Sequence, residues 1–408
     1  MNLRPILSSL SRHKSAVAIL LAEVALTCAI LCNALFLIQR RLEAISVESG
    51  VQEASLLHIS LTGIGEQQDA MAQTRTDLSS IKALPGVANA SIVSQVPLTN
   101  SSWNSGVTRT ADDQAEPINA TMYMGDDAML DTFGLKLVAG RPFGPDEFLE
   151  IPDEAAFNRG FPKAAIITRA MAEKLYPGEK AVGKTFYMGT PDPITVVGMV
   201  DSLRRPSSGR AEEQAQLSML LPVHFPYTLA HRYIVRVQPG ADPKQVLDAV
   251  IAELKKVNPR RVILDKQGFP EMRHKFFAQD RAMVALLSIV CLILLVVTAF
   301  GIVGLASFWV QQRTKQIGVR RALGATRGQI LRYFQAENFI IVTVGVMLGM
   351  MLAYGINQWL MGKYELPRLP WFYLPIGAMS LWLLGQLAVL WPALRAASIP
   401  PATATRSV

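Results

Sequence analysis

The chain has 408 residues, of which half are hydrophobic and 18 % are charged, whereas about a quarter of the residues are charged in an average soluble protein. This composition argues against an ordinary soluble protein and predicts membrane-spanning segments. We attribute the formal net charge of +8 to basic residues that orient such segments, and nucleic acid is a poor candidate as a partner. The cysteines all fall in apolar runs, so no disulfide framework is expected.

Four apolar runs are long enough to cross a bilayer as helices, for which about 20 residues are needed. They cover residues 16–38, 282–310, 336–360 and 372–394. Glu23 is the only charged residue in the first run. That run is longer than the core of a signal peptide, and Gln39-Arg40-Arg41 follows it instead of small residues. We therefore expect the first run to remain in the mature protein as an anchor.

Basic residues predict how these helices are oriented, because Lys and Arg favour the cytoplasmic side. The stub 1–15, the segment 311–335 and the tail 395–408 contain Lys or Arg and no acidic residue. They are therefore predicted to be cytoplasmic. Residues 39–281 and the loop 361–371 are then predicted to lie on the other side, which gives one helix before a large outer domain and three helices after it.

The predicted outer domain alternates strands and helices. In chain order we expect a strand at 55–61, a helix at 70–84, strands at 87–96, 118–124, 194–200 and 233–237, and a helix at 243–257. The first and last parts follow the same order, so 55–105 and 228–265 are predicted to form one split α/β subdomain. Residues 106–227 would then be a β-rich insertion. Helical stalks are predicted at both ends of the domain, over 39–53 and 271–281.

The cytoplasmic segment 313–334 predicts two helices joined by a tight break. Helix-forming residues run from Arg313 to Leu323, and Gly324 suits the left-handed position that ends a helix. Thr326 and Gln329 have the spacing of a capping box that starts the next helix. The first of these helices is basic on one side and offers a few apolar side chains, so it is a candidate contact surface.

This segment closely resembles the hallmark of MacB/FtsX-type ABC transporter permeases, whose usual form is R-x-x-E-I-G-x-R-x-A-x-G-A. Here the string is R-T-K-Q-I-G-V-R-R-A-L-G-A-T, residues 313–326. The tail 392–406 is similar to the family's ending. The stretches 138–143, 171–186 and 195–200 resemble parts of its MacB-like periplasmic core domain. The resemblance implies a multi-pass protein of the bacterial inner membrane with both termini cytoplasmic.

The resemblance also implies the partners and the site. A second permease copy or a paralogue would complete a dimer, and a separate ABC ATPase subunit would hold ATP and magnesium, so this chain itself would need no cofactor and would not be an enzyme. A periplasmic adaptor protein and membrane lipids are further expected partners. The residues expected to dock on the ATPase are Arg313, Gln316, Ile317, Arg320, Arg321, Leu323 and Gly324.

Two departures from the family pattern bear on this docking. Gln316 stands where the family usually has Glu, and the tail lacks the family's acidic residue. Basic residues at this membrane edge could also serve only as a topology signal that touches anionic lipid. The family string together with the helix–break–helix pattern favours docking.

The resemblance implies that ATP-driven movement of the outer domain serves export or extraction of amphipathic peptides, antibiotics or lipoproteins. The alternative is a regulatory scaffold that activates a periplasmic partner, as in the cell-division branch of the family. The length of the outer domain favours transport. A sensor kinase or receptor would need a cytoplasmic signalling domain, for which the predicted cytoplasmic segments are too short.

Several other features of the sequence are less specific. Glu23 inside the first span has either a structural role between helices or a role in coupling. Residues 178–185 match the letters of a phosphate-binding loop, but a helix is predicted before them and a strand after them, the reverse of what phosphate binding needs. Gly345, Gly349 and Ala353 predict a close helix-packing face. The histidines are scattered and predict no metal site.

Overall fold

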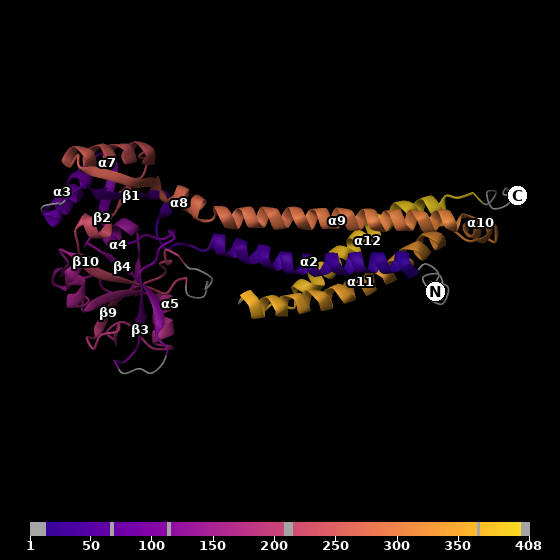
Figure 1. Ribbon diagram of the computed structural model, residues 1–408, viewed down its shortest axis with the longest axis horizontal. Helices are drawn as coiled ribbons and strands as arrows, with labels where there is room; N and C mark the ends of the chain where they lie inside the picture. Colours follow the sequence, from indigo (N-terminus) through magenta and orange to yellow (C-terminus); the bar gives the residue numbers. More distant parts are fainter. Residues whose placement is uncertain (1–13, 66–68, 112–115, 208–214, 365–367, 401–408) are drawn as a thin grey trace. The chain divides into compact units, whose positions relative to one another are not determined.

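The computed structural model describes residues 14–65, 69–111, 116–207, 215–364 and 368–400. The chain divides into two compact units (Figure 1). The helical unit comprises Met1–Ile45 and Gln279–Val408, and the α/β unit comprises Ser46–Ala278. The fold class predicted from the sequence is confirmed, because the chain has four long apolar helices and a large α/β domain with two sheets.

The first sheet of the α/β unit joins strands from both ends of the unit. Its order is β12-β1-β11-β2, and all neighbours are antiparallel. The strands are β1 (Leu56–Gly63), β2 (Val87–Ile92), β11 (Arg232–Val237) and β12 (Arg261–Gly268), and the helices that pack on them are α3 (Ala70–Lys82) and α7 (Pro243–Val257). The predicted split α/β subdomain is therefore confirmed, and α7 has the predicted bounds.

The second sheet is built by the insertion, in the order β3-β4-β10-β7-β9-β5, with two short strands paired at its side. Its strands are β3 (Asn104–Val107), β4 (Ile118–Gly125), β5 (Leu137–Gly140), β6 (Leu149–Glu150), β7 (Ala164–Thr168), β8 (Thr185–Phe186), β9 (Ile194–Val200) and β10 (Ser218–His224). The short helices are η1 (Glu53–Ser55), α4 (Met129–Phe133), η2 (Pro145–Glu147), η3 (Glu154–Arg159), α5 (Arg169–Leu175), α6 (Tyr227–Ala230) and α8 (Phe269–Phe276).

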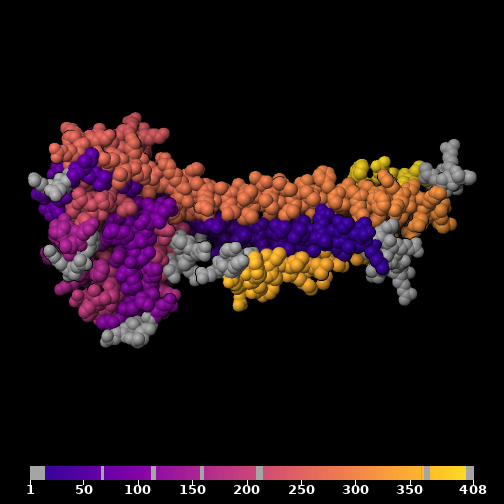
Figure 2. Space-filling view, viewed as in Figure 1, coloured from indigo at the N-terminus to yellow at the C-terminus, as the bar shows by residue number. Residues whose placement is uncertain are grey.

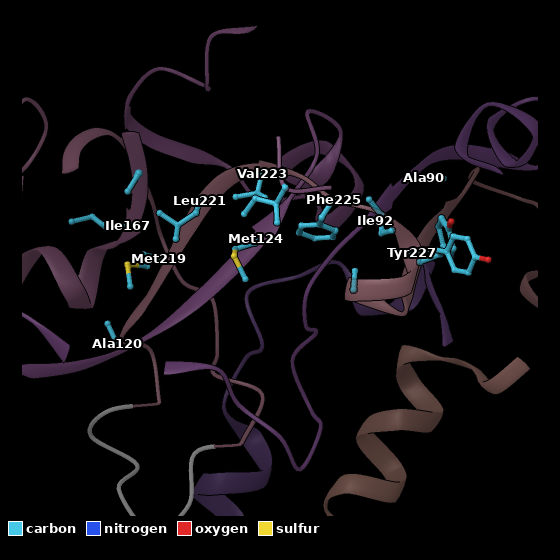
Figure 3. Close-up of a cluster of buried hydrophobic side chains, with 14 of the residues drawn as sticks. Ala90, Ile92, Ala120, Met124, Ile167, Met219, Leu221, Val223, Phe225 and Tyr227 are labelled. Atoms are coloured by element: carbon cyan, nitrogen blue, oxygen red, sulfur yellow. The ribbon is translucent and has the colours of Figure 1, made fainter. Parts of the chain in front are cut away.

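One apolar core runs through both subdomains of the α/β unit. Ile92 of β2 belongs to the same buried cluster as Met124 of β4 and Leu221 of β10, as Figure 3 shows. Burial of this apolar surface is the main force that holds the insertion on the split sheet. The two subdomains therefore form one folded body, even though each has its own sheet.

A fully buried ion pair fixes α3 on the split sheet. Asp77 of α3 lies 2.7 Å from the guanidinium of Arg261 on β12, and neither side chain is exposed. The hydroxyl of Tyr233 donates a hydrogen bond of 2.7 Å to the same carboxylate oxygen. A buried charge without its partner is strongly destabilising, so Asp77 and Arg261 depend on each other. The pair ties the first half of the split subdomain to the second.

The helical unit contains four helices of sufficient length and hydropathy to span a membrane. They are α2 (Lys14–Ser46), α9 (Ala278–Gln312), α11 (Arg327–Tyr364) and α12 (Tyr373–Ala397), and the shorter α10 (Thr314–Ala322) lies between α9 and α11. The space-filling view shows α9 exposed along much of its length within this unit (Figure 2). The chain is a multi-pass membrane protein.

Small residues bring α2 and α11 into close contact. A Cβ atom at Gly345 would lie 2.8 Å from a methyl carbon of Val24, and one at Gly349 would lie 2.5 Å from Cβ of Cys28. Ala353, one turn further along α11, is fully buried. The predicted packing face is confirmed, because any larger side chain at either glycine would force the helices apart.

The structure corrects the predicted stalk helices. Helix α2 ends at Ser46 and does not reach residue 53. Gly50 has a φ of +85°, which a helix cannot continue through. On the other side, α8 and α9 are two helices separated at Phe277, whose side chain is buried. Gly50 is a local signal for the first break that the prediction passed over, whereas the second break falls within a run of helix-forming residues.

Asp126, at the junction of the two subdomains, predicts a pH dependence of stability. Its carboxylate accepts hydrogen bonds from the Ser91 hydroxyl at 2.5 Å and from the backbone of Ala128 at 3.2 Å. Burial raises the pKa of Asp126 to about 6. An unfolded Asp ionises near pH ~4, so the folded state retains a proton that the unfolded state loses, and stability falls as the pH rises from about 4 to about 6.

We therefore expect Asp126→Asn to remove this loss of stability, because an asparagine does not ionise and its amide oxygen can accept the same two hydrogen bonds. The variant should be more stable than the unaltered chain at pH 8, by on the order of 2 kcal/mol, and should differ little at pH 4. Thermal unfolding of the purified chain at both pH values measures the effect. Asp146→Asn, at an exposed position, is the control. An unchanged pH dependence in Asp126→Asn would contradict the assignment.

Candidate functional site

The candidate site is α10 with the turn that follows it. Gly324 has a φ of +96°, as the sequence predicted. Its N–H donates to the carbonyl of Arg321 at 3.1 Å, and the N–H of Ala325 donates to the carbonyl of Arg320 at 3.0 Å. These two bonds form a Schellman motif, which satisfies the last carbonyls of the helix. The end of α10 is therefore fixed by its own backbone.

The start of α11 is fixed equally well. The N–H of Gln329 donates to the Thr326 hydroxyl at 3.3 Å, and the N–H of Thr326 donates to the Gln329 side chain at 3.0 Å. This reciprocal pair is the predicted capping box. Together with the Schellman motif, it makes the connection between α10 and α11 a defined turn rather than a loose loop.

Ile317 holds α10 against the other helices of the unit. Its side chain is only 5 % exposed and belongs to a cluster with Ile330 and Phe334 of α11 and Ala393 and Ala396 of α12. The sequence led us to expect Ile317 on the ATPase. The structure corrects this role, because a side chain packed inside the chain itself offers no surface to a partner. Ile317 positions α10 instead.

An ion pair that the sequence analysis missed fixes the junction between α9 and α10. One Nη atom of Arg313 lies 2.8 and 3.1 Å from the two carboxylate oxygens of Glu337, whose side chain is 1 % exposed. The guanidinium also lies over the ring of Trp309, 5.6 Å from its centroid. A signal was present, since Glu337 is the sole acidic residue between positions 281 and 364. Arg313 thus has a partner within the chain.

Arg321 ties α10 to the end of α12. Its guanidinium donates hydrogen bonds to the carbonyls of Ala397 at 3.1 Å and Ile399 at 2.6 Å. The carbonyls at a helix C-terminus carry partial negative charge, so a cation is favourable there. Of the basic residues predicted to meet the ATPase, Arg313 and Arg321 are therefore engaged inside the helical unit.

The opposite side of α10 is open. Gln316, Val319, Arg320 and Leu323 are all exposed, and they recur at intervals of three and four residues, which places them on one helix face. Leu323 is 84 % exposed and Val319 is 51 % exposed. We call these four residues the docking face. It combines two apolar side chains with one amide and one positive charge.

Glu23 lies between α2 and α9. A Cβ atom at Gly301 would come within 2.6 Å of its carboxylate, so a larger residue there would displace the end of the Glu23 side chain. The other carboxylate oxygen is buried and has no hydrogen-bond partner among the described residues. One turn further along, the hydroxyls of Thr27 and Thr298 lie 2.9 Å apart. These contacts are compatible with both interpretations of Glu23, a structural role and a role in coupling.

The phosphate-loop pattern has the predicted helix before it, α5, and the predicted strand after it, β8. Lys184 pairs with Glu179 inside the loop, and its ammonium lies 5.2 Å from the centre of the Tyr176 ring. This is a turn held by its own side chains, without a helix N-terminus aimed at a phosphate. Among the described residues, no three His, Cys, Asp or Glu side chains gather closely enough to hold a metal ion.

The different environments of Ile317 and Leu323 give a direct test of the site. Ile317→Asp would place a charge in an apolar cluster and should lower the stability of the helical unit by a few kcal/mol. Leu323→Asp, on the docking face, should leave stability nearly unchanged. Thermal unfolding of both variants in the same detergent compares them. Equal stability of the two variants would contradict the burial of Ile317.

Comparison with known protein families identifies two domains along the chain. Residues 25–253 match the MacB-like periplasmic core domain, and residues 288–401 match the FtsX-like permease C-terminal domain. The periplasmic region of MacB from Actinobacillus actinomycetemcomitans aligns with 58 % of this chain and 97 % of that one, at 14 % identity and a TM-score of 0.35.

Two relatives illustrate the extent of the match. The macrolide export ATP-binding/permease protein MacB of Chromobacterium violaceum is 27 % identical, over 55 % of this chain and 33 % of its own length. The uncharacterized ABC transporter permease YknZ of Bacillus subtilis is 25 % identical, over 71 % of each chain. The chain thus spans less than half the length of the MacB relatives it matches. Because the core-domain match alone covers more than half of this chain, the chain belongs to the MacB-like periplasmic core domain family and is a MacB/FtsX-type ABC transporter permease.

Proposed function

We propose that this permease couples ATP hydrolysis by a partner ATPase to movement of its α/β unit. It would work as a dimer with a second copy or a paralogue in the bacterial inner membrane. Both termini and α10 would lie in the cytoplasm and the α/β unit outside. ATP and magnesium would be bound by the partner, and this chain would hold no cofactor of its own.

The observation that carries this proposal is the docking face on a rigidly held helix. Leu323 and Val319 expose apolar surface, which favours burial against another protein. The rest of α10 is fixed by Ile317, by the Arg313–Glu337 pair and by the hydrogen bonds of Arg321. These contacts reach α11 and α12, so a displacement of the docking face would move several membrane helices together.

The proposed cargo follows from the family alone. Amphipathic peptides, antibiotics or lipoproteins would be exported or extracted by movement of the α/β unit, with or without a periplasmic adaptor protein. In this scheme the cargo need not pass between the membrane helices.

The docking face predicts the effect of one substitution on ATPase binding. Leu323→Asp would bury a carboxylate without a defined partner at the contact, so recovery of the ATPase with the purified permease should fall at least tenfold. Leu264→Asp is the matched control, because Leu264 is 59 % exposed on β12 of the α/β unit. Normal ATPase recovery and activity with Leu323→Asp would mean that α10 is only a topology signal.

Membrane orientation has its own test. A cysteine at Lys174, exposed on α5, should react with an impermeant maleimide added to intact cells. A cysteine at Gln316 should react only after the membrane is opened. Ser208 and Ser407, the natural first choices in an outer loop and in the tail, lie outside the described residues. Labelling of position 316 from outside would exclude the proposed topology.

A further inference from the structure

The chain enters the α/β unit through residues 46–55 and leaves it through α8. We call these two segments the connectors, since they continue from α2 and into α9 along the chain. Arg273 of α8 and Glu53 join them by a two-pronged ion pair. Nε and one Nη of Arg273 each donate to a carboxylate oxygen of Glu53 at 2.7 Å. Arg273 also donates to the carbonyl of Val47 at 3.1 Å, and the Ser49 hydroxyl donates to Glu53.

This pair is partly buried and stays ionised. The Glu53 side chain is 19 % exposed and that of Arg273 is 24 % exposed. Burial raises the pKa of Glu53, but the hydrogen bonds from Arg273 and Ser49 outweigh it, and the pKa lies below the ordinary value of a glutamate. The guanidinium of Arg273 also lies 5.5 Å from the centre of the Phe277 ring. Two parallel charged hydrogen bonds fix the geometry more tightly than one would.

The first connector is attached to the insertion. The carbonyl of Ser49 accepts a hydrogen bond of 2.8 Å from the backbone of Arg204. Gly50 lies against Ser202 so closely that a Cβ atom would be 2.1 Å from its carbonyl oxygen. Arg204 in turn accepts a hydrogen bond of 2.5 Å at its carbonyl from the Tyr123 hydroxyl on β4. A pull that arrives from α2 therefore meets these contacts with the insertion before it reaches β1 of the split sheet, which begins at Leu56.

The second connector is attached to the split subdomain. β12 ends at Gly268 and leads directly into α8, which packs on β1 and β12. Phe269 and Met272 of α8 are buried in one cluster with Leu56 at the start of β1. The same cluster includes Leu220 of the insertion, but the backbone of α8 continues directly from β12, so a pull on α8 acts on the split sheet through the chain itself. Besides the packing of α8 on η1, the Glu53–Arg273 pair and the hydrogen bond from Arg273 to Val47 link the two connectors directly.

We propose that Glu53 and Arg273 are positioning residues that lock the connectors together, so that force arriving along α2 and α9 moves both subdomains as one body. This rests on the proposed function, because the force comes from the ATPase. An ion pair between Arg41 of α2 and Asp280 of α9 links the same two chain segments within the helical unit. Without the Glu53–Arg273 pair, displacement of the connectors would load the shared apolar core alone and shift the insertion relative to the split subdomain.

The full chain with its ATPase, in lipid nanodiscs, provides the test. Spin labels at Lys174→Cys on α5 and Lys255→Cys on α7, both exposed positions, report the separation of the subdomains. The natural cysteines are buried in the helical unit, and a sample without the introduced pair gives their background. Pulsed electron–electron double resonance measures the distance between the two labels. The distance in the nucleotide-free state is compared with that in the state trapped by ATP and vanadate.

We expect the label separation to be the same in both states with the native pair. In Glu53→Gln it should shift on trapping by more than the width of the native distribution. The charge-reversed double variant, Glu53→Arg with Arg273→Glu, should restore most of the native behaviour. Glu147→Gln is the matched control, because Glu147 receives two hydrogen bonds from Arg141 at 2.8 and 2.7 Å but belongs to neither connector.

Three results would overturn the proposal: no nucleotide-dependent shift in Glu53→Gln, an equal broadening in both states, or a shift already present in the native chain. Equal broadening would mark a merely structural pair. If Glu53→Gln fails to fold, Arg273→Lys makes the same test, since lysine keeps the positive charge but cannot form the two parallel hydrogen bonds of the guanidinium. Failure of the proposed function would look different, because the native chain would then recover no ATPase at all. In that case the proposed role of the Glu53–Arg273 pair would also be wrong.

Discussion

The orientation of α10 depends on one ion pair at the edge of the helical unit. Glu337 is almost completely buried, and a carboxylate in such a place is stable only with a partner that satisfies it. Arg313 supplies that partner from the junction of α9 and α10, and so it determines where α10 begins. Ile317 and Arg321 then fix the rest of the helix. The exposed docking face is a consequence of these inward contacts, because every side chain on the inner face is already engaged.

The α/β unit also uses ion pairs to connect segments that are distant in the sequence. Asp77–Arg261 connects the two halves of the split subdomain, and Glu53–Arg273 connects the two ends of the unit. Each pair bridges segments that are far apart in the sequence and adjacent in the fold. Apolar burial supplies most of the stability, but it is not directional. Bidentate or fully buried pairs add a fixed geometry that apolar burial alone does not supply.

Local rules explain why much of this architecture could be predicted from the sequence. The apolar runs, the period of α7, the left-handed Gly324 and the capping box of Thr326 each depend on neighbouring residues. The burial of Ile317 could not be predicted in this way, because its neighbours Ala393 and Ala396 on α12 are far from it in the sequence and meet it only in the folded chain. The break at Phe277 was missed for the same reason, since tertiary contacts override local helix preference there, whereas Gly50 is a local signal that the prediction passed over.

Gln316 gives the docking face a charge that differs from the family pattern. A glutamate at this position would lie one turn before Arg320, where an acid followed by a base four residues later forms a favourable pair. With glutamine, no such pair offsets the positive charge of Arg320, whose guanidinium lies 5.3 Å from the centre of the Tyr333 ring. The docking face therefore carries one more net positive charge than it would with the usual residue. In the docking proposed above, this charge bears on which ATPase the chain accepts, since charge complementarity at the rim governs the choice of partner more than the strength of binding.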